Sequence, residues 1–170
     1  IGLVTVVHFA PQDVELVAGP PTSRRRYLDI TIAQVDSRYV RSLAHYGKVL
    51  LQRNHLLRRI RDRQARADQL GFWDGELVNA GAYVVMRRLE TVARLARLGH
   101  DAHRDLAAQR ELLEIGYRST VPASDLPDGD LDARLEAVAA SFREALTAAL
   151  PRELQVGASI VGPHRDDLTF

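Results

Sequence analysis

Residues 37–68 read SRYVRSLAHYGKVLLQRNHLLRRIRDRQARAD, and this stretch decides the fold. Ser37 can cap a helix with its hydroxyl, and the positions behind it repeat at alternating steps of three and four, the spacing of a coiled-coil seam. The seam residues are Val40, Leu43, Gly47, Leu50, Asn54 and Leu57. We predict one helix from Ser37 to about Asp68, roughly 45 Å long at 1.5 Å per residue. Because a compact chain of this size is roughly 40 Å across, the apolar stripe of this helix needs a partner.

The next segment supplies that partner. Gly71 breaks the pattern, and Asp74 can cap a second helix from Gly75 to about Arg97. Its buried side is expected to be Leu77, Ala80, Tyr83, Val84, Leu89, Val92 and Leu95. Gly99 should interrupt this helix, and a shorter helix is expected over residues 100–107. The two long helices are therefore predicted to form an antiparallel pair.

Further helices and strands flank the pair. Thr22 can cap a helix to about Val35, and Asp130 can cap one over Leu131–Leu150, with Pro151 just behind it. Strands are expected over residues 1–9, 112–121 and 156–161, where β-branched and apolar residues gather. The predicted class is mostly α with short β segments (α+β).

Length and composition set outer limits on function. The chain has 170 residues and a mass of 19.0 kDa, which suits one domain or one large lobe. The apolar fraction of 46% and the charged fraction of 26% are typical of globular proteins. The absence of cysteine excludes disulfides, thiolate zinc sites and cysteine nucleophiles. Both ends, at Ile1 and Phe170, fall at strand-like stretches, so we expect the chain to be cut from a larger protein.

Arginine dominates the positive charge. Lys48 is the only lysine among 23 basic residues, which leaves 22 arginines. The guanidinium is a planar fork of donors that suits phosphates and carboxylates. Codon bias is the plain alternative explanation. The candidates for contacts with DNA or a partner protein are Arg24, Arg25, Arg26, Lys48, Arg53, Arg58 and Arg59.

Two segments carry these candidates. The stretch Gly19–Arg26 brings three arginines to the first turn of a helix, where free N–H groups favour an anion. The alternative there is salt bridges to Asp13, Glu15 or Asp29. Along the long helix, a row of arginines could follow a nucleic-acid backbone, or it could be an ordinary solvated face. Aromatic residues do not alternate with these arginines, so the sequence gives no support for base stacking.

The third cluster, GPHRDD at residues 162–167, follows a predicted strand. Two carboxylates and an imidazole could bind a metal or transfer protons, but consecutive side chains rarely converge on one ion. A loop that orders a neighbouring site is the favoured interpretation. No phosphate loop of the G-x-x-x-x-G-K-[ST] type, no G-x-G-x-x-G and no G-x-S-x-G is present.

Several motifs together resemble the middle of RecF, the bacterial recombinational-repair ATPase. The quoted positions are Phe9-x-Pro11-x-Asp13, Gly19-x-Pro21, Arg24–Asp29, Tyr39, Leu50, Gln52–Asn54, Leu57, Trp73-Asp74, Gly81-Ala82, Arg87-Arg88, Tyr117 and Val161–Leu168-x-Phe170. The resemblance covers essentially the whole chain. Pro20 stands where the family commonly has a second glycine. The sequence departs from the family pattern there, and the shape of that turn is expected to differ.

The resemblance implies an SMC-type ABC ATPase in which a short helical lobe replaces a long coiled coil. The family is expected to bind ATP and Mg²⁺, to form an ATP-dependent homodimer, and to bind DNA at single-strand/double-strand junctions. With RecO and RecR it would help to load RecA at gaps, in the cytoplasm, as part of recombination and the SOS response. The full-length family would be a weak ATPase. This chain lacks the Walker A, Walker B and signature motifs, so alone it should bind no nucleotide and be inactive.

On this basis we expect three parts. Residues 1–21 would end the ATPase head, residues 22–150 would form the helical lobe, and residues 151–170 would return to the head through a strand and the motif Gly162, Pro163, His164, Arg165, Asp166 and Asp167. No catalytic residue and no metal ligand is assigned. The alternative function is an arm for protein interaction or dimerisation that makes no direct contact with DNA.

Overall fold

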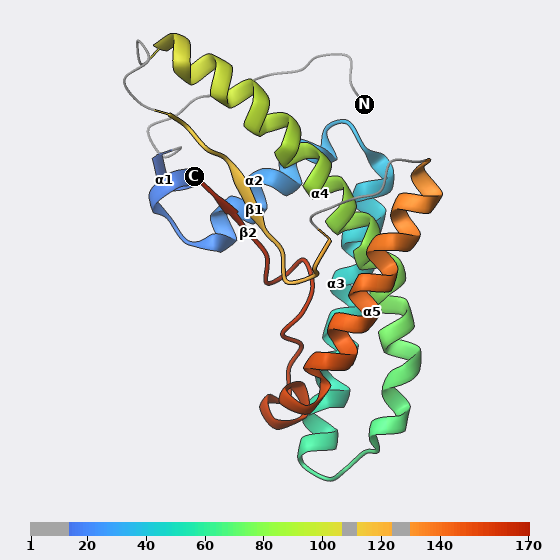
Figure 1. Cartoon of the computed structure of the whole chain (residues 1–170). Helices are drawn as coiled ribbons and strands as arrows, with labels where there is room; N and C mark the ends of the chain where they lie inside the picture. Colours follow the sequence, from blue (N-terminus) through green and yellow to red (C-terminus); the bar gives the residue numbers. More distant parts are fainter. Residues whose placement is uncertain (1–13, 107–111, 124–129) are drawn as a thin grey trace. The chain divides into compact units, whose positions relative to one another are not determined.

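A computed structural model describes residues 14–106, 112–123 and 130–170. The strand predicted over residues 1–9 lies outside the described residues. In chain order the elements are α1 (Glu15–Ala18), α2 (Pro21–Ala33), α3 (Ser37–Arg61), the 3₁₀ helix η2 (Ala67–Gln69), α4 (Leu70–Leu106), β1 (Gly116–Arg118), α5 (Leu131–Val156) and β2 (Asp167–Thr169) (Figure 1). The predicted class, mostly helical with a little β-structure, is confirmed.

Helix α3 begins at Ser37 as predicted but ends at Arg61, seven residues before the expected Asp68. Two backbone hydrogen bonds close the helix, from Gln64 N–H to the Arg59 carbonyl (2.7 Å) and from Arg63 N–H to the Ile60 carbonyl (2.9 Å). These are the two bonds of a Schellman motif, which needs a left-handed residue after the helix. That residue is Arg63, with φ of 60°. The sequence concealed this stop because glycine is the usual residue there.

Helix α4 is longer than predicted at both ends. It starts at Leu70, so Gly71 does not break the pattern and Asp74 is not a cap. It also continues through Gly99 to Leu106, which makes the separate helix expected over residues 100–107 wrong. At Gly99 an added Cβ would lie 2.8 Å from Ile115, so glycine allows this close approach rather than ending the helix.

Helix α5 begins as predicted, because the side chain of Asp130 accepts a hydrogen bond from the N–H of Ala133 (2.9 Å). It then runs through Pro151 to Val156 and ends at Gly157, which has φ of 73°. The strand predicted over residues 156–161 is therefore wrong. Packing explains the extra turn, since Leu150 and Leu154 lie against the core formed by Leu56, Leu57 and Leu70.

The sheet has two short strands. β1 and β2 pair antiparallel, with Gly116 opposite Thr169 and Arg118 opposite Asp167. The strand predicted over residues 112–121 is real only at its centre. The second strand begins at Asp167, the last residue of the GPHRDD segment, for which a loop was the favoured interpretation.

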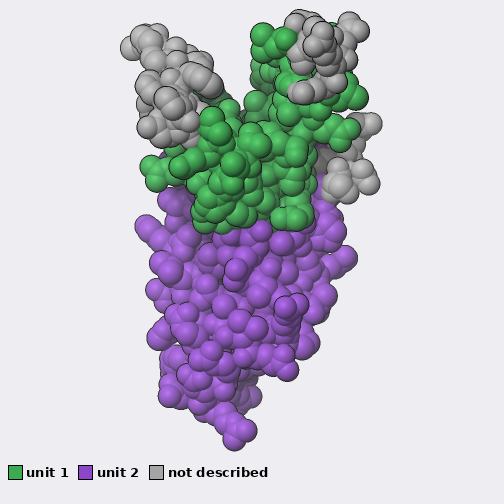
Figure 2. All heavy atoms as spheres, turned by 90° about the vertical axis from the view of Figure 1, so that its left-hand side faces the viewer, with its two compact units in different colours: residues 1–37, 87–118, 166–170 green, residues 38–86, 119–165 purple. Residues whose placement is uncertain are grey.

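The described residues form two compact units, coloured separately in Figure 2. Of the described residues, unit 1 comprises 14–37, 87–106, 112–118 and 166–170, and unit 2 comprises 38–86, 119–123 and 130–165. In unit 2, α3 and the first half of α4 form the predicted antiparallel pair, and α5 packs against it (Figure 1). Unit 1 contains α2, the second half of α4 and the two-stranded sheet. No described helix is long and apolar enough to cross a membrane.

Candidate nucleic-acid interface

Arg53 is the centre of a buried polar cluster in unit 2. Its side chain is 0% exposed. Its Nε donates to Asp74 Oδ1 (2.7 Å), its Nη1 donates to Ser159 Oγ (2.7 Å), and the same Nη1 lies 2.7 Å from Glu153 Oε2. A side chain enclosed in this way has no surface to offer DNA. The prediction that Arg53 contacts DNA or a partner is wrong, because its guanidinium is committed to the core.

The same cluster fixes the chain that follows α5. The N–H of Ser159 donates to Asn54 Oδ1 (2.7 Å), and the N–H of Ile160 donates to Glu153 Oε1 (2.8 Å). The N–H groups of Ser159 and Ile160 are thus satisfied by side chains rather than by a sheet ladder. This is the physical reason that an apolar, strand-like sequence is not a strand here.

The motif at residues 162–165 lies on the same cluster. The Tyr46 hydroxyl is 2.6 Å from Nδ1 of His164, and Nε2 of His164 is 3.1 Å from the Ser159 carbonyl oxygen. Since that carbonyl can only accept, a neutral ring satisfies both contacts when Nε2 carries the proton. Arg165 donates to the same carbonyl (3.3 Å). His164 is held as a structural group and is not presented as a free base.

Gly162 and Pro163 form the buried turn of this motif. Gly162 has φ of 125°, and an added Cβ would collide with the Tyr46 hydroxyl. Its N–H donates to Thr120 Oγ1 (2.8 Å). Only glycine fits this backbone and this approach together.

In unit 1, the two motif blocks that stood far apart in the sequence meet. Arg24 donates to both carboxylate oxygens of Asp167, at 2.8 and 2.9 Å, and Arg25 donates to the backbone carbonyl of Asp166 (2.8 Å). The hydrogen bond from Arg24 is the main reason that the pKa of Asp167 is lowered from its ordinary value. The carboxylate that pairs with Arg24 is thus Asp167, and not one of the nearby acidic residues that the sequence offered as salt-bridge partners. Arg26 is exposed beside them.

A second buried arginine supports this arrangement. Arg88, 2% exposed, donates through Nη2 to Asp29 Oδ1 (2.7 Å), and the Tyr117 hydroxyl donates to Asp166 Oδ2 (2.7 Å). Burial raises the pKa of Tyr117 well above its ordinary value, with the charges of Arg88 and Asp166 acting in opposite directions. The sequence places Asp29 near three arginines, but its partner is the distant Arg88.

Three of the candidates remain on the surface of α3. Lys48, Arg58 and Arg59 are exposed, and none forms an ion pair with another described residue. Lys48 and Arg59 are eleven residues apart, three helical turns, and so share one face of α3. The exposed His55 lies between them on that face. This set, Lys48, Arg58 and Arg59, is called the α3 basic face below.

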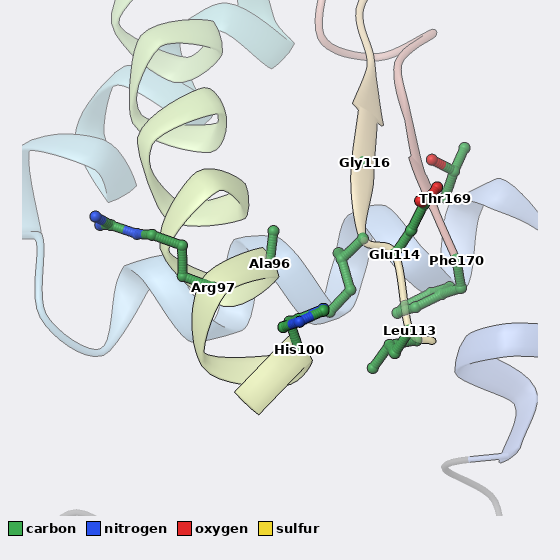
Figure 3. A pocket seen from close by; sticks show the side chains of 9 residues that line it. Ala96, Arg97, His100, Leu113, Glu114, Gly116, Thr169 and Phe170 are labelled. Atoms are coloured by element: carbon green, nitrogen blue, oxygen red, sulfur yellow. The ribbon is translucent and has the colours of Figure 1, made fainter. Parts of the chain in front are cut away.

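The chemistry of the remaining surface is limited. Over the described ranges, no group of three or more His, Asp or Glu residues is placed to hold a metal ion. A hollow of about 570 Å³ in unit 1 lies between the end of α4 and the sheet (Figure 3). Leu113, Ile115 and Phe170 give it an apolar lining, with Arg97, His100 and Glu114 around them. His100, Glu114 and Thr169 also line it, and no described hydrogen bond or ion pair joins these three.

The buried polar partners were missed at the sequence level for a specific reason. The buried residues of α3 are Tyr39, Tyr46, Val49, Arg53, Leu56 and Leu57. Leu57 was predicted, whereas each of the other five lies one residue before a position of the predicted seam. The two tyrosines fix this register. With Tyr39 and Tyr46 seven residues apart, the next heptad position is Arg53, and that spacing was the available signal.

Comparison with known proteins shows one consistent likeness. No protein-family model matches the chain. The DNA replication and repair protein RecF of Herpetosiphon aurantiacus is 44% identical over 172 residues, covering 100% of this chain and 41% of that protein. RecF of Chloroflexus aggregans is also 44% identical and is covered over 43% of its length. The chain thus spans about two fifths of the length of these relatives.

Solved structures agree with this likeness. A structure described as the recombination mediator protein RecF-ATP in the RecFOR pathway superposes with a TM-score of 0.85 at 29% identity. It covers 98% of this chain and 43% of the solved one. A RecF-ATPrS structure in the same pathway gives a TM-score of 0.84 at 28% identity over 94% of this chain.

Proposed function

Because the chain belongs to the RecF family, we propose that it is the helical part of a DNA repair protein and that the α3 basic face binds DNA backbone phosphates. The curated relatives are DNA replication and repair proteins. The observation that carries the proposal is that basic residues of the same helix, α3, differ in burial and in ion pairing. Arg53 is buried and forms an ion pair, whereas Lys48, Arg58 and Arg59 are exposed and form no ion pair among the described residues; Arg59 only donates a long hydrogen bond to the Gln64 carbonyl (3.4 Å).

The chemistry of this face suits a phosphate backbone. Lysine and arginine contact phosphates without reading the bases, so such binding is independent of sequence and sensitive to salt. Each phosphate contact lowers log K by about 0.9 per log unit of salt on duplex DNA. Arg24 and Arg25 are weaker candidates than the α3 basic face because their guanidinium groups already bind Asp167 and the Asp166 carbonyl. Arg26 remains a candidate.

ATP enters the proposal only through the parts of the relatives that this chain does not span. The sequence has no phosphate loop of the G-x-x-x-x-G-K-[ST] type, and in the described ranges no three His, Asp or Glu residues are grouped to hold a metal ion. We assign ATP binding, ATP-dependent dimerisation and any weak ATPase activity to the parts of the full-length protein outside these 170 residues.

The cellular role that we propose for the full-length protein rests on its likeness to RecF proteins. The protein would act in the cytoplasm at single-strand gaps and would assist RecA loading together with RecO and RecR. Residues 22–150 would form its helical lobe, with residues 1–21 and 151–170 connecting to the head. In the competing function, the α3 basic face docks carboxylates of a partner protein and does not touch DNA.

The test uses the full-length protein and a gapped DNA duplex. The Arg58→Glu/Arg59→Glu variant should bind more weakly, and the slope of log K against log salt should fall by roughly 1.8. The matched control is Arg94→Glu/Arg143→Glu, which makes the same change in net charge at two exposed positions of α4 and α5. Unchanged DNA binding in the first variant, together with loss of a RecR complex, would favour the protein-docking function instead.

A further inference from the structure

Phe72 lies in the first turn of α4 and is 68% exposed. Two nearby apolar side chains are anchored instead: Leu70 is 2% exposed, and Trp73 packs against the core that contains Leu56 and Leu57. The rings of Phe72 and Trp73 meet edge to face, with centroids 5.1 Å apart and planes at 78°. Phe72 is therefore supported by an anchored aromatic ring while most of its own surface remains accessible.

The helix around Phe72 is bare. Gly71 and Gly75 are exposed, and an added Cβ at either would meet nothing within 4 Å. Neither glycine is required by a turn or by close packing within unit 2, although glycine disfavours a helix interior. Gly71, Phe72 and Gly75 lie on one side of α4, since Gly75 is four residues after Gly71 and three after Phe72. The result is an aromatic ring beside uncovered backbone.

The connection leading to this face is positively charged. Residues 58–68 contain five arginines against two aspartates, an excess of three positive charges. Arg63 is exposed and holds a left-handed backbone conformation that arginine disfavours. Arg66 is paired only at the surface, with Asp68 (2.8 Å). Counting on to Glu76 lowers the excess to one, but Asp74 accepts from Arg53 (2.7 Å) and Glu76 lies 2.9 Å from His45. The exposed arginines of the connection therefore make a polyanion the complementary occupant for the surface around Phe72.

We infer that single-stranded DNA passes over the first turn of α4 and the connection before it, and that one of its bases stacks on Phe72. This deepens the proposed function and rests on it. In single strands the bases expose their π faces, and aromatic side chains in a basic surface bind them without regard to sequence. In a duplex those faces are stacked on each other. Phe72 therefore selects single-stranded over duplex DNA, while the arginines bind the phosphates of both.

The experiment compares a 20-nucleotide oligothymidylate with a 20-base-pair duplex, using full-length protein at several salt concentrations. Phe72→Ala should weaken single-strand binding by about 5- to 100-fold and change duplex binding less than 2-fold. The slope of log K against log salt should stay the same, because no charge is removed. Phe72→Trp should restore the affinity. Leu98→Ala, at a residue that is 58% exposed on α4 and lies outside the α3 basic face, is the matched control and should have no effect.

The outcomes separate the two proposals. If Phe72→Ala leaves single-strand affinity unchanged, or weakens both DNAs equally, stacking is wrong. If Arg58→Glu/Arg59→Glu still weakens binding in that case, the proposed DNA function stands without it. If neither variant changes binding of any DNA, both proposals are wrong. Loss of a protein partner in Phe72→Ala, with unchanged oligothymidylate binding, also overturns the inference.

Discussion

The middle of α3 and its C-terminal end both carry arginine, but they place it in opposite surroundings. Arg53 is fully buried against Asp74, Glu153 and Ser159, whereas Arg58 and Arg59, less than two turns further on, face solvent. A buried ion pair is costly to break because the remaining partner keeps an uncompensated charge. An exposed arginine adds little stability and is available to a ligand. The same residue type thus serves the fold in one place and the proposed function in the other.

The largest expected effect is at Arg53. Arg53→Met leaves Glu153 buried without its partner and should lower the free energy of unfolding by about 3–5 kcal/mol. Urea unfolding of the full-length protein measures this. The double variant Arg53→Met/Glu153→Met should cost less than the two single changes added together. A loss below about 1 kcal/mol for Arg53→Met would show that the buried cluster does not hold the fold.

Gly81 offers a smaller test of the same buried region. An added Cβ would lie 2.6 Å from Phe142 and 2.9 Å from Tyr46. Gly81→Ala should therefore destabilise unit 2 by about 1–3 kcal/mol through overpacking. Gly75→Ala, with open space around it, is the matched control and should raise stability by up to about 1 kcal/mol. Equal thermal shifts for the two variants would mean that the packing around Tyr46 is looser than described.

Acid sensitivity tests the paired arginine of unit 1. Because Arg24 holds the pKa of Asp167 below its ordinary value of 3.8, this carboxylate adds stability above about pH 3.8. That contribution is lost as the pH falls through the lower pKa of the folded state. Asp167→Asn should reduce stability at pH 7 and make unfolding less dependent on pH below 5. Parallel pH profiles of the variant and the parent protein would contradict the pairing.

The smallest effect concerns the end of α3. Arg63 occupies a left-handed position that glycine prefers, so Arg63→Gly should raise the free energy of unfolding by up to about 1 kcal/mol. Affinity for DNA should fall at the same time if the charge matters. Calorimetry and a binding titration on one sample measure both, with Arg94→Gly as the helix-interior control, which should lose stability. A destabilised Arg63→Gly variant would show that the arginine side chain itself stabilises the turn.

Much of the helical arrangement could be predicted from the sequence, but the difference between the buried and the exposed arginines of α3 could not. The start of α3, the cap at Asp130 and the antiparallel pair all follow from local spacing and capping. Local patterns failed where tertiary packing decides, as at Gly71, which α4 passes through, and at Pro151, which α5 passes through. The site showed the same division: residue type marked the arginines as important, while only their three-dimensional partners separate Arg53 from Arg58.

The most direct test of this division is to measure DNA affinity and unfolding free energy together on two variants of the full-length protein. Arg58→Glu/Arg59→Glu should lose affinity for gapped DNA while its unfolding free energy stays within about 0.5 kcal/mol of the parent. Arg53→Met should lose stability by several times that amount. If the charge-reversal variant binds DNA as the parent does, or if it unfolds as readily as Arg53→Met, the exposed and buried arginines do not have the separate roles assigned to them.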